Sequence, residues 1–108
     1  MGKQLKLSEQ EETMTYKRVD DNQALVTKAL RAEGWTVQHL HEVGKGCPDL
    51  IVGAKEKNFL VEVKDGKKAW KLTPDQVIWH YNWKGQVVVV TSPENAVETI
   101  NKLLKEAR

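Results

Sequence analysis

Hydrophobic residues change their spacing several times along the chain, and each spacing predicts a different element. In residues 19–35, "VDDNQALVTKALRAEGW", they recur at the interval of an amphipathic helix. The residues of its apolar side are Leu25, Val26, Ala29 and Leu30. Asp20 or Asp21 is placed to cap the start of this helix, and Gly34 is placed to end it.

Shorter spacings follow and predict three strands. Residues 35–43 alternate, with Trp35, Val37 and His39 on one side. After the loop "GKGCP", two apolar stretches, residues 49–55 and 58–64, are joined by a short polar turn and predict a hairpin.

The second half of the chain predicts a helix, a strand and a helix. Residues 73–85 begin with Thr73 as N-cap and Pro74 at the first position, and Gly85 ends them. The expected apolar side of this helix consists of Val77, Ile78 and Tyr81. The run "QVVVVTS" is typical of a strand that is buried on both faces.

The last helix begins after Ser92 as N-cap, with Pro93 next. Its inward-facing residues are Ala96, Val97, Ile100, Leu103 and Leu104. The complete order is α-β-β-β-α-β-α, which predicts an α/β fold with a mixed central sheet flanked by helices. Residues 1–18 show no sustained period and are expected to form a tail or arm, and residues 19–108 a single domain.

The composition indicates the class and cellular location of the protein more than its chemistry. The 108 residues are 40% hydrophobic and 30% charged, which fits one globular core. No apolar run is long enough to span a bilayer, and the N-terminal residues lack the pattern of a secretory signal. Cys47 is the only cysteine, so no intramolecular disulfide is possible. The expected location is therefore a reducing cytoplasm.

Charged residues interrupt the predicted hairpin at positions where hydrophobic residues are expected. Glu62 and Lys64 are two apart and therefore point to the same face of their strand. Pairing of the two strands brings Asp49 beside Glu62. Two adjacent carboxylates repel each other unless a cation lies between them, and such oxygen ligands suit Mg²⁺ or Mn²⁺. A lysine next to that cation can orient a water or neutralise charge on a phosphate.

These residues carry a resemblance to a known family. "PD" at Pro48–Asp49 and "EVK" at Glu62–Lys64 resemble the signature of the PD-(D/E)xK nuclease superfamily, whose restriction-endonuclease-like core has the order αβββαβ. The segments "GCPDLIVG", "VEVK" and "TPDQVIWH" are most similar to VRR-NUC-type nucleases and small phage-encoded relatives. The resemblance extends over roughly residues 20–97.

The resemblance implies a set of site residues, namely Asp49, Glu62, Lys64 and Gln76. It implies that Asp49, Glu62 and the backbone carbonyl of Val63 bind the metal, and that Lys64 positions the attacking water or stabilises the phosphate. Gln76 on the following helix helps to hold water or phosphate. For a further acidic ligand from the first helix the candidates are Asp20 and Asp21, of which Asp20 is chosen, and Asn22 could reach the edge of the site instead.

A basic segment follows the signature and predicts contact with phosphates. In "KDGKKAWK", the expected DNA-binding residues are Lys67, Lys68, Trp70 and Lys71. A solvated loop is the alternative interpretation. His80 lies one turn after Gln76 and is a further candidate for a phosphate contact. Trp79 and Trp83 share a helix face, which indicates core packing, a dimer interface or base stacking.

The function expected from these features is that of a Mg²⁺- or Mn²⁺-dependent DNA endonuclease that selects branched or junction DNA. Cutting two strands requires two sites, which favours a homodimer with the Trp79–Trp83 face at its interface. The expected setting is a bacterial or phage-infected cell. Two alternatives stay open: a monomeric nuclease that nicks flaps or single strands, and a non-catalytic DNA-binding module of the same fold.

Overall fold

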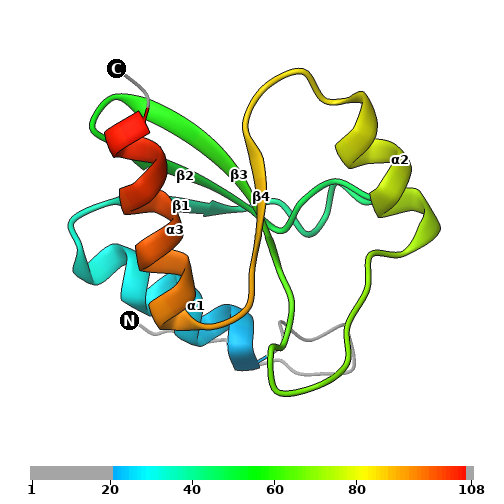
Figure 1. The fold of residues 1–108 in the computed structure, drawn as a ribbon, viewed down its shortest axis with the longest axis horizontal. Helices are drawn as coiled ribbons and strands as arrows, with labels where there is room; N and C mark the ends of the chain where they lie inside the picture. The colour runs from blue at the N-terminus through cyan, green and yellow to red at the C-terminus, as the bar shows by residue number, and fades with distance from the viewer. Residues whose placement is uncertain (1–20, 107–108) are drawn as a thin grey trace.

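The computed structural model describes residues 21–106, and the predicted order of helices and strands is confirmed within them (Figure 1). The elements are α1 (Asp21–Ala32), β1 (Thr36–His39), β2 (Leu50–Ala54), β3 (Lys57–Val63), α2 (Pro74–Asn82), β4 (Val87–Val90) and α3 (Pro93–Glu106). The expected tail and Asp20 lie outside the described residues, so the predicted domain boundary stays a prediction.

The four strands form one mixed sheet in the order β1-β2-β3-β4. The first three strands are antiparallel, and β4 runs parallel to β3. The predicted hairpin between β2 and β3 turns at Lys55 and Glu56, which both have positive φ angles (50° and 68°). Two such residues in succession are what a two-residue turn between twisted strands requires.

Helices α1 and α3 pack on one face of the sheet and form the core with it (Figure 1). The alternate residues Phe59, Val61 and Val63 of β3 are buried on this face. Helix α1 buries a different stripe from the predicted one, namely Gln23, Val26, Thr27 and Leu30. The expectation for Leu25 is wrong, because its side chain is exposed. On α3, Ala96 and Ile100 are buried as predicted.

The expectation that the β4 strand is buried on both faces is wrong. Only Val90 is buried, and Val87 to Val89 are half-buried. The reason is the place of β4 in the sheet, since it is an edge strand with a single neighbour. A run of valines identifies a strand by its β propensity, but it does not decide whether a second layer covers that strand.

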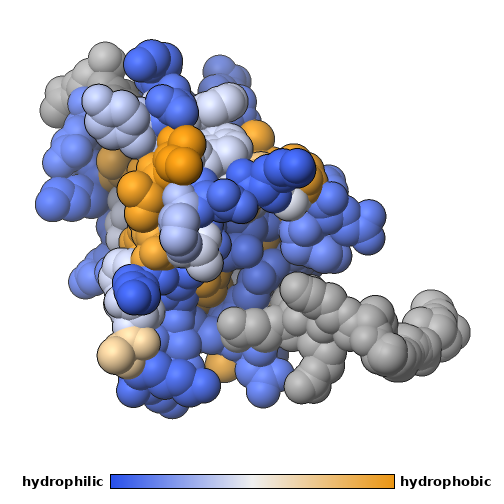
Figure 2. Space-filling model, turned by 90° about the vertical axis from the view of Figure 1, so that its right-hand side faces the viewer, coloured by the Kyte–Doolittle hydropathy of each residue, from blue (hydrophilic) through white to orange (hydrophobic). Residues whose placement is uncertain are grey.

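Helix α2 lies on the other side of the sheet from α1 and α3 (Figure 1). None of its nine residues is buried. The prediction that Val77, Ile78 and Tyr81 face a core is therefore wrong, and Tyr81 is 85% exposed. Figure 2 looks at the side of the molecule on which α2 lies and shows hydrophobic side chains gathered there among hydrophilic ones. Among the described residues, no helix is both long enough and apolar enough to cross a membrane.

Candidate active site

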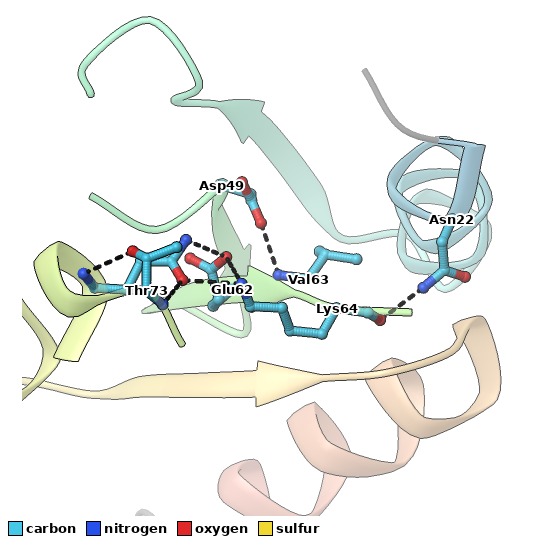
Figure 3. A network of polar contacts seen from close by, with 7 residues as sticks. Asn22, Asp49, Glu62, Val63, Lys64 and Thr73 are labelled. Carbon is cyan, nitrogen blue, oxygen red and sulfur yellow. Dashed lines mark hydrogen bonds and ion pairs between the residues drawn. The ribbon is translucent and has the colours of Figure 1, made fainter. Parts of the chain in front are cut away.

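The charged residues of the hairpin project from the face of the sheet opposite to α1 and α3. Because Phe59, Val61 and Val63 face the helices, Glu62 and Lys64 extend to the other side. Figure 3 shows the side chains of Asp49, Glu62, Lys64 and Thr73 converging beside the end of β3. The predicted placement of Asp49 next to Glu62 follows from the register, in which Leu50 is opposite Val61.

Asp49 is held by the backbone of the neighbouring strand. Its Oδ2 accepts a hydrogen bond of 2.8 Å from the Val63 amide. Strand β2 begins only at Leu50, so the Asp49 carboxylate supplies the partner that a continued strand would provide. This bond holds the carboxylate beside the Glu62–Val63 peptide.

Glu62 is a buried carboxyl, with its side chain only 2% exposed. Its Oε2 accepts a 3.0 Å hydrogen bond from Gln76 Nε2 and lies 3.6 Å from Lys64 Nζ. Its Oε1 is buried and has no hydrogen-bond partner among the described residues. Burial, together with the nearby Asp49 charge, raises the pKa of Glu62 to about 8, although Lys64 opposes this rise.

Gln76 connects the helix to both charged groups. Its Oε1 accepts hydrogen bonds from Lys64 Nζ (2.8 Å) and from the Thr73 amide (2.9 Å). In return, Thr73 Oγ1 accepts a 3.2 Å hydrogen bond from the backbone N–H of Gln76. This reciprocal pair is a capping box, and it fixes which end of the carboxamide faces Lys64 and which faces Glu62.

A comparison with solved structures identifies a protein of similar fold. A solved structure described as "VRR_NUC domain" matches with a TM-score of 0.59 and 28% sequence identity, covering 75% of this chain and 91% of that chain. This chain has a VRR-NUC-type nuclease fold. The resemblance to the PD-(D/E)xK superfamily and the predicted restriction-endonuclease-like fold are thereby confirmed. No family model and no curated protein matches the sequence. A phage origin stays a prediction.

One residue of the candidate site has a second role that the sequence analysis does not assign to it. The sequence predicts Thr73 only as a helix cap, yet Thr73 also orients Gln76. The signal was present in "TPDQ", which has the spacing of a capping box. That the box also serves the site depends on Lys64 and Glu62 lying beside it, and this is decided by tertiary structure.

The loop that leads to Asp49 is fixed against α2. Gly44, Lys45 and Gly46 all have positive φ angles (74°, 54° and 84°). A Cβ atom at Gly46 would clash with the backbone carbonyl of Asp75. The glycine therefore permits both the left-handed turn and a direct backbone contact with the first turn of α2.

Helix α1 reaches the edge of the site through Asn22. Its Nδ2 donates to the backbone carbonyls of Lys64 (2.8 Å) and Thr91 (3.3 Å) (Figure 3). Asn22 thus contacts the main chain at the ends of β3 and β4. The predicted role of Asp20 as a metal ligand stays a prediction, because this residue lies outside the described ones.

The predicted DNA-binding residues lie around the site but do not all join it. Lys67, Lys68, Trp70 and Lys71 are exposed in the loop between β3 and α2. His80 is half-buried on α2, and its Nε2 has no hydrogen-bond partner among the described residues. Burial first, and then the positive charge of Lys64, lower the pKa of His80. His80 lies one helical turn after Gln76, so both residues are on the side of α2 that faces the site.

Cys47 is not an activated nucleophile in this site. It is half-buried. Burial first, and then the charges of Glu62 and Asp49, raise the pKa of its thiol. A raised pKa keeps the sulfur protonated and unreactive near neutral pH. This agrees with its interpretation as a small side chain in the turn before Asp49.

The donor atoms of the site fit a hard divalent cation. Within residues 21–106 no group of three or more His, Cys, Asp or Glu side chains is arranged to hold a metal ion. Mg²⁺, however, keeps several waters and is often bound by one or two carboxylates. The unpartnered Oε1 of buried Glu62 is the atom that such a cation would satisfy. Asp49, whose carboxylate is bonded to the Val63 amide, supplies further oxygen atoms beside it. The expected role of the Val63 carbonyl stays a prediction.

Proposed function

We propose that the protein is a divalent-metal-dependent endonuclease that hydrolyses phosphodiester bonds in DNA. The observation that carries this proposal is the convergence of Asp49, Glu62 and Lys64 on a sheet face that α1 and α3 leave uncovered. The Val63 amide holds Asp49, and Gln76 holds Glu62 and Lys64. The nuclease fold supports it, since nuclease domains act on nucleic acids.

Three groups of this chain would hold Mg²⁺ or Mn²⁺: the carboxylates of Asp49 and Glu62 and the backbone carbonyl of Val63. When bound, the cation neutralises negative charge on the phosphate and lowers the pKa of the attacking water. The Val63 amide keeps the Asp49 carboxylate oriented. Glu62 has to lose its proton to bind the cation, because burial keeps its pKa high without one.

Lys64 supplies the positive charge beside these carboxylates. Its Nζ orients the water, or neutralises the charge that develops on the phosphate as a fifth oxygen approaches. Gln76 holds this ammonium group with its Oε1 while its Nε2 holds Glu62. One carboxamide thereby sets the distance between the lysine and the carboxylate.

We further propose that two copies of the chain associate through α2 and act on branched DNA. On α2, the hydrophobic side chains of Val77 and Tyr81 lie one helical turn apart and are both exposed, which leaves an apolar face without a partner among the described residues. A second copy would bury this face, and a symmetric pair would supply one site for each strand. This assigns the interface to a different face from the predicted Trp79–Trp83 side.

The nuclease proposal is tested by incubating labelled flap, junction and plain duplex DNA with the protein in Mg²⁺, Mn²⁺ or chelator. We expect cleavage only with metal, and a loss of about 100-fold or more in Asp49→Ala. Glu98→Gln, on the opposite helix layer, is the matched control and should cleave like the parent. Metal-independent cleavage, or equal cleavage by Asp49→Ala, would refute the assignment.

If the protein binds these DNAs but cleaves none of them, it is a DNA-binding module instead. The dimer is tested separately by light scattering with and without DNA. Tyr81→Asp should convert a dimer into a monomer, because it places a charge in an apolar contact. A parent protein that is monomeric at micromolar concentration under both conditions rules out the α2 interface.

A further inference from the structure

A cavity lies next to the candidate active site and plays no part in the chemistry described above. It has a volume of about 240 Å³ and lies between the Gly44–Gly46 turn and α2. Its lining residues are Lys45, Asp75, Ile78, Trp79, Asn82 and Trp83. They combine aromatic surface, an ammonium group, a carboxylate and an amide. A cavity of this size is smaller than the roughly 300–1,000 Å³ of pockets for drug-sized ligands, so it suits one ring system.

The aromatic wall of this cavity is ordered by its own contacts. The rings of Trp79 and Trp83 stack at 4.7 Å with an interplanar angle of 17°. Trp83 is still 47% exposed, so part of its surface is free for a ligand. Gly85 makes room for the indole, because a Cβ atom there would lie 2.9 Å from Trp83 Nε1. A flat, rigid aromatic surface of this kind is suited to stacking against a planar ring.

The cavity is fixed relative to the proposed catalytic residues on two sides. Lys45 at its edge precedes Gly46, whose backbone contacts Asp75, and the chain continues to Asp49. On α2, Asp75 lines the cavity and the next residue, Gln76, contacts Glu62 and Lys64. Trp79 is also in edge-to-face contact with His80 at 6.2 Å. One short turn and one helical turn therefore separate the cavity from the site.

Lys45 is held in an unusual backbone conformation at the edge of the cavity. Its φ angle of 54° is rare for a residue with a side chain, and glycines flank it on both sides. Such conformations persist where the surrounding structure imposes them, and they are concentrated at ligand sites. Here Gly46 lies against the first turn of α2, and the turn places Lys45 at the edge of the cavity.

We propose that this cavity receives one unpaired nucleobase of the substrate DNA, close to the phosphodiester that is cleaved. Stacking on Trp83 recognises the ring without regard to sequence. Asp75 and Asn82 offer an acceptor and an amide for the edge of the base. The Asp75 carboxylate disfavours a phosphate inside the cavity, whereas Lys45 at the edge suits the phosphate attached to that base. A paired base cannot enter, because its edges and faces are occupied in the duplex.

This inference rests on the proposed function and narrows it. The preferred substrate is DNA with an unpaired base beside the cut, as occurs at bulges, flaps and junctions, and plain duplex is a poorer one. Selection then depends on whether a base is free to leave the helix. Selection does not depend on the base sequence of the DNA around the cut.

The test compares three DNA duplexes of equal length: one with a bulged adenine, one with a bulged abasic residue, and one fully paired. Binding is measured by fluorescence anisotropy in chelator, so that no cleavage occurs. We expect the bulged adenine to bind about 10-fold more tightly than the abasic bulge, in line with the stacking of one base. In Trp83→Ala this ratio should fall to about one.

Trp70→Ala is the matched variant, because Trp70 is similarly exposed but lies in the lysine-rich loop outside the cavity. It should keep the ratio even if both affinities fall. Equal affinity of the parent for adenine and abasic bulges overturns the proposal. So does a ratio that disappears in Trp70→Ala and persists in Trp83→Ala, since the base would then stack in the loop.

A measurement on the parent protein avoids dependence on the folding of Trp83→Ala. 2-Aminopurine at the bulged position should lose fluorescence when it stacks on the indole, and an increase on binding would overturn the proposal. Incubating the same bulged duplexes with Mg²⁺ tests the cavity and the nuclease activity separately. Metal-dependent cleavage without discrimination between base and abasic residue refutes the cavity alone, whereas absence of both binding and cleavage refutes the nuclease as well.

Discussion

At the scale of single residues, the site is defined by a carboxyl group that folding places in an unfavourable environment. Glu62 is buried next to Asp49, and one of its two oxygens has no partner among the described residues. Lys64 lies 3.6 Å from the other oxygen but does not compensate fully, since the pKa of Glu62 is still raised to about 8. A group held in this way has a measurable effect on stability.

The stability of the metal-free protein should decrease as pH rises from about 4.5 to about 8. In this window the unfolded Glu62 has lost its proton while the folded one retains it, so raising the pH favours unfolding. The slope from this group is at most about 1.4 kcal/mol per pH unit. Urea unfolding in chelator at several pH values measures it. Glu62→Gln should be less dependent on pH than the parent, and identical profiles would contradict the raised pKa.

Thr73 allows a second test at this scale, because it positions Gln76 without contacting Glu62 or Lys64. Thr73→Ala should lower the free energy of unfolding by about 0.5–2 kcal/mol through loss of the cap. Cleavage should also decrease, since the carboxamide can then rotate. Thr73→Ser keeps the hydroxyl and should restore both properties. If Thr73→Ala loses stability but cleaves at the parental rate under conditions where it is folded, Thr73 is only a cap.

At the scale of elements, the notable feature is that α2 is held mainly by contacts of its first turn and contributes no buried residue to the core. None of its residues is buried, while its first turn contacts the Gly46 backbone and, through Gln76, the end of β3. The helix and the loop before Asp49 therefore depend on each other. This dependence predicts that Gly46, which contacts α2, contributes more to stability than Gly44 in the same loop.

Gly46→Ala and Gly44→Ala form a matched pair. Both residues have positive φ angles, so each substitution should cost about 1 kcal/mol or more in backbone strain. Only at Gly46 does the added carbon meet the Asp75 backbone, whereas at Gly44 no atom lies within 4 Å. We expect Gly46→Ala to be clearly less stable in urea unfolding and to lose cleavage. Equal losses of stability in both variants would show that the loop–helix contact is unimportant.

At the scale of the whole molecule, the sheet separates the hydrophobic core from the candidate active site. One face carries α1, α3 and the hydrophobic core, and the other carries the polar network and α2 (Figure 1). The net charge of +2 is too small to attract DNA by itself. Attraction must therefore come from local charge, and the lysines between β3 and α2 are the strongest candidates because both ends of their loop lead into the site.

Replacing Lys67, Lys68 and Lys71 together by alanine should reduce the salt dependence of DNA binding. If all three contact phosphates, the slope of log K against log salt concentration becomes smaller by about 2–3. Anisotropy titrations at several salt concentrations in chelator measure the slope. Lys57→Ala with Lys102→Ala, which removes exposed charges at the far end of β3 and on α3, is the control. An unchanged slope in the triple variant would show that the loop does not contact the DNA backbone.

The sequence by itself determined the order of the elements and the identity of the central residues. Alternation along a strand is enough to place Glu62 and Lys64 on one face, and pairing of neighbouring strands is enough to bring Asp49 beside them. Tertiary structure alone decided the direction in which α2 faces, the position of β4 at the edge of the sheet, and the orientation of Gln76. It also decided that Lys45 and Trp83 line one cavity. Periodicity describes a residue relative to its own element, whereas these features depend on which elements pack together, and that is set by contacts between residues far apart in the chain.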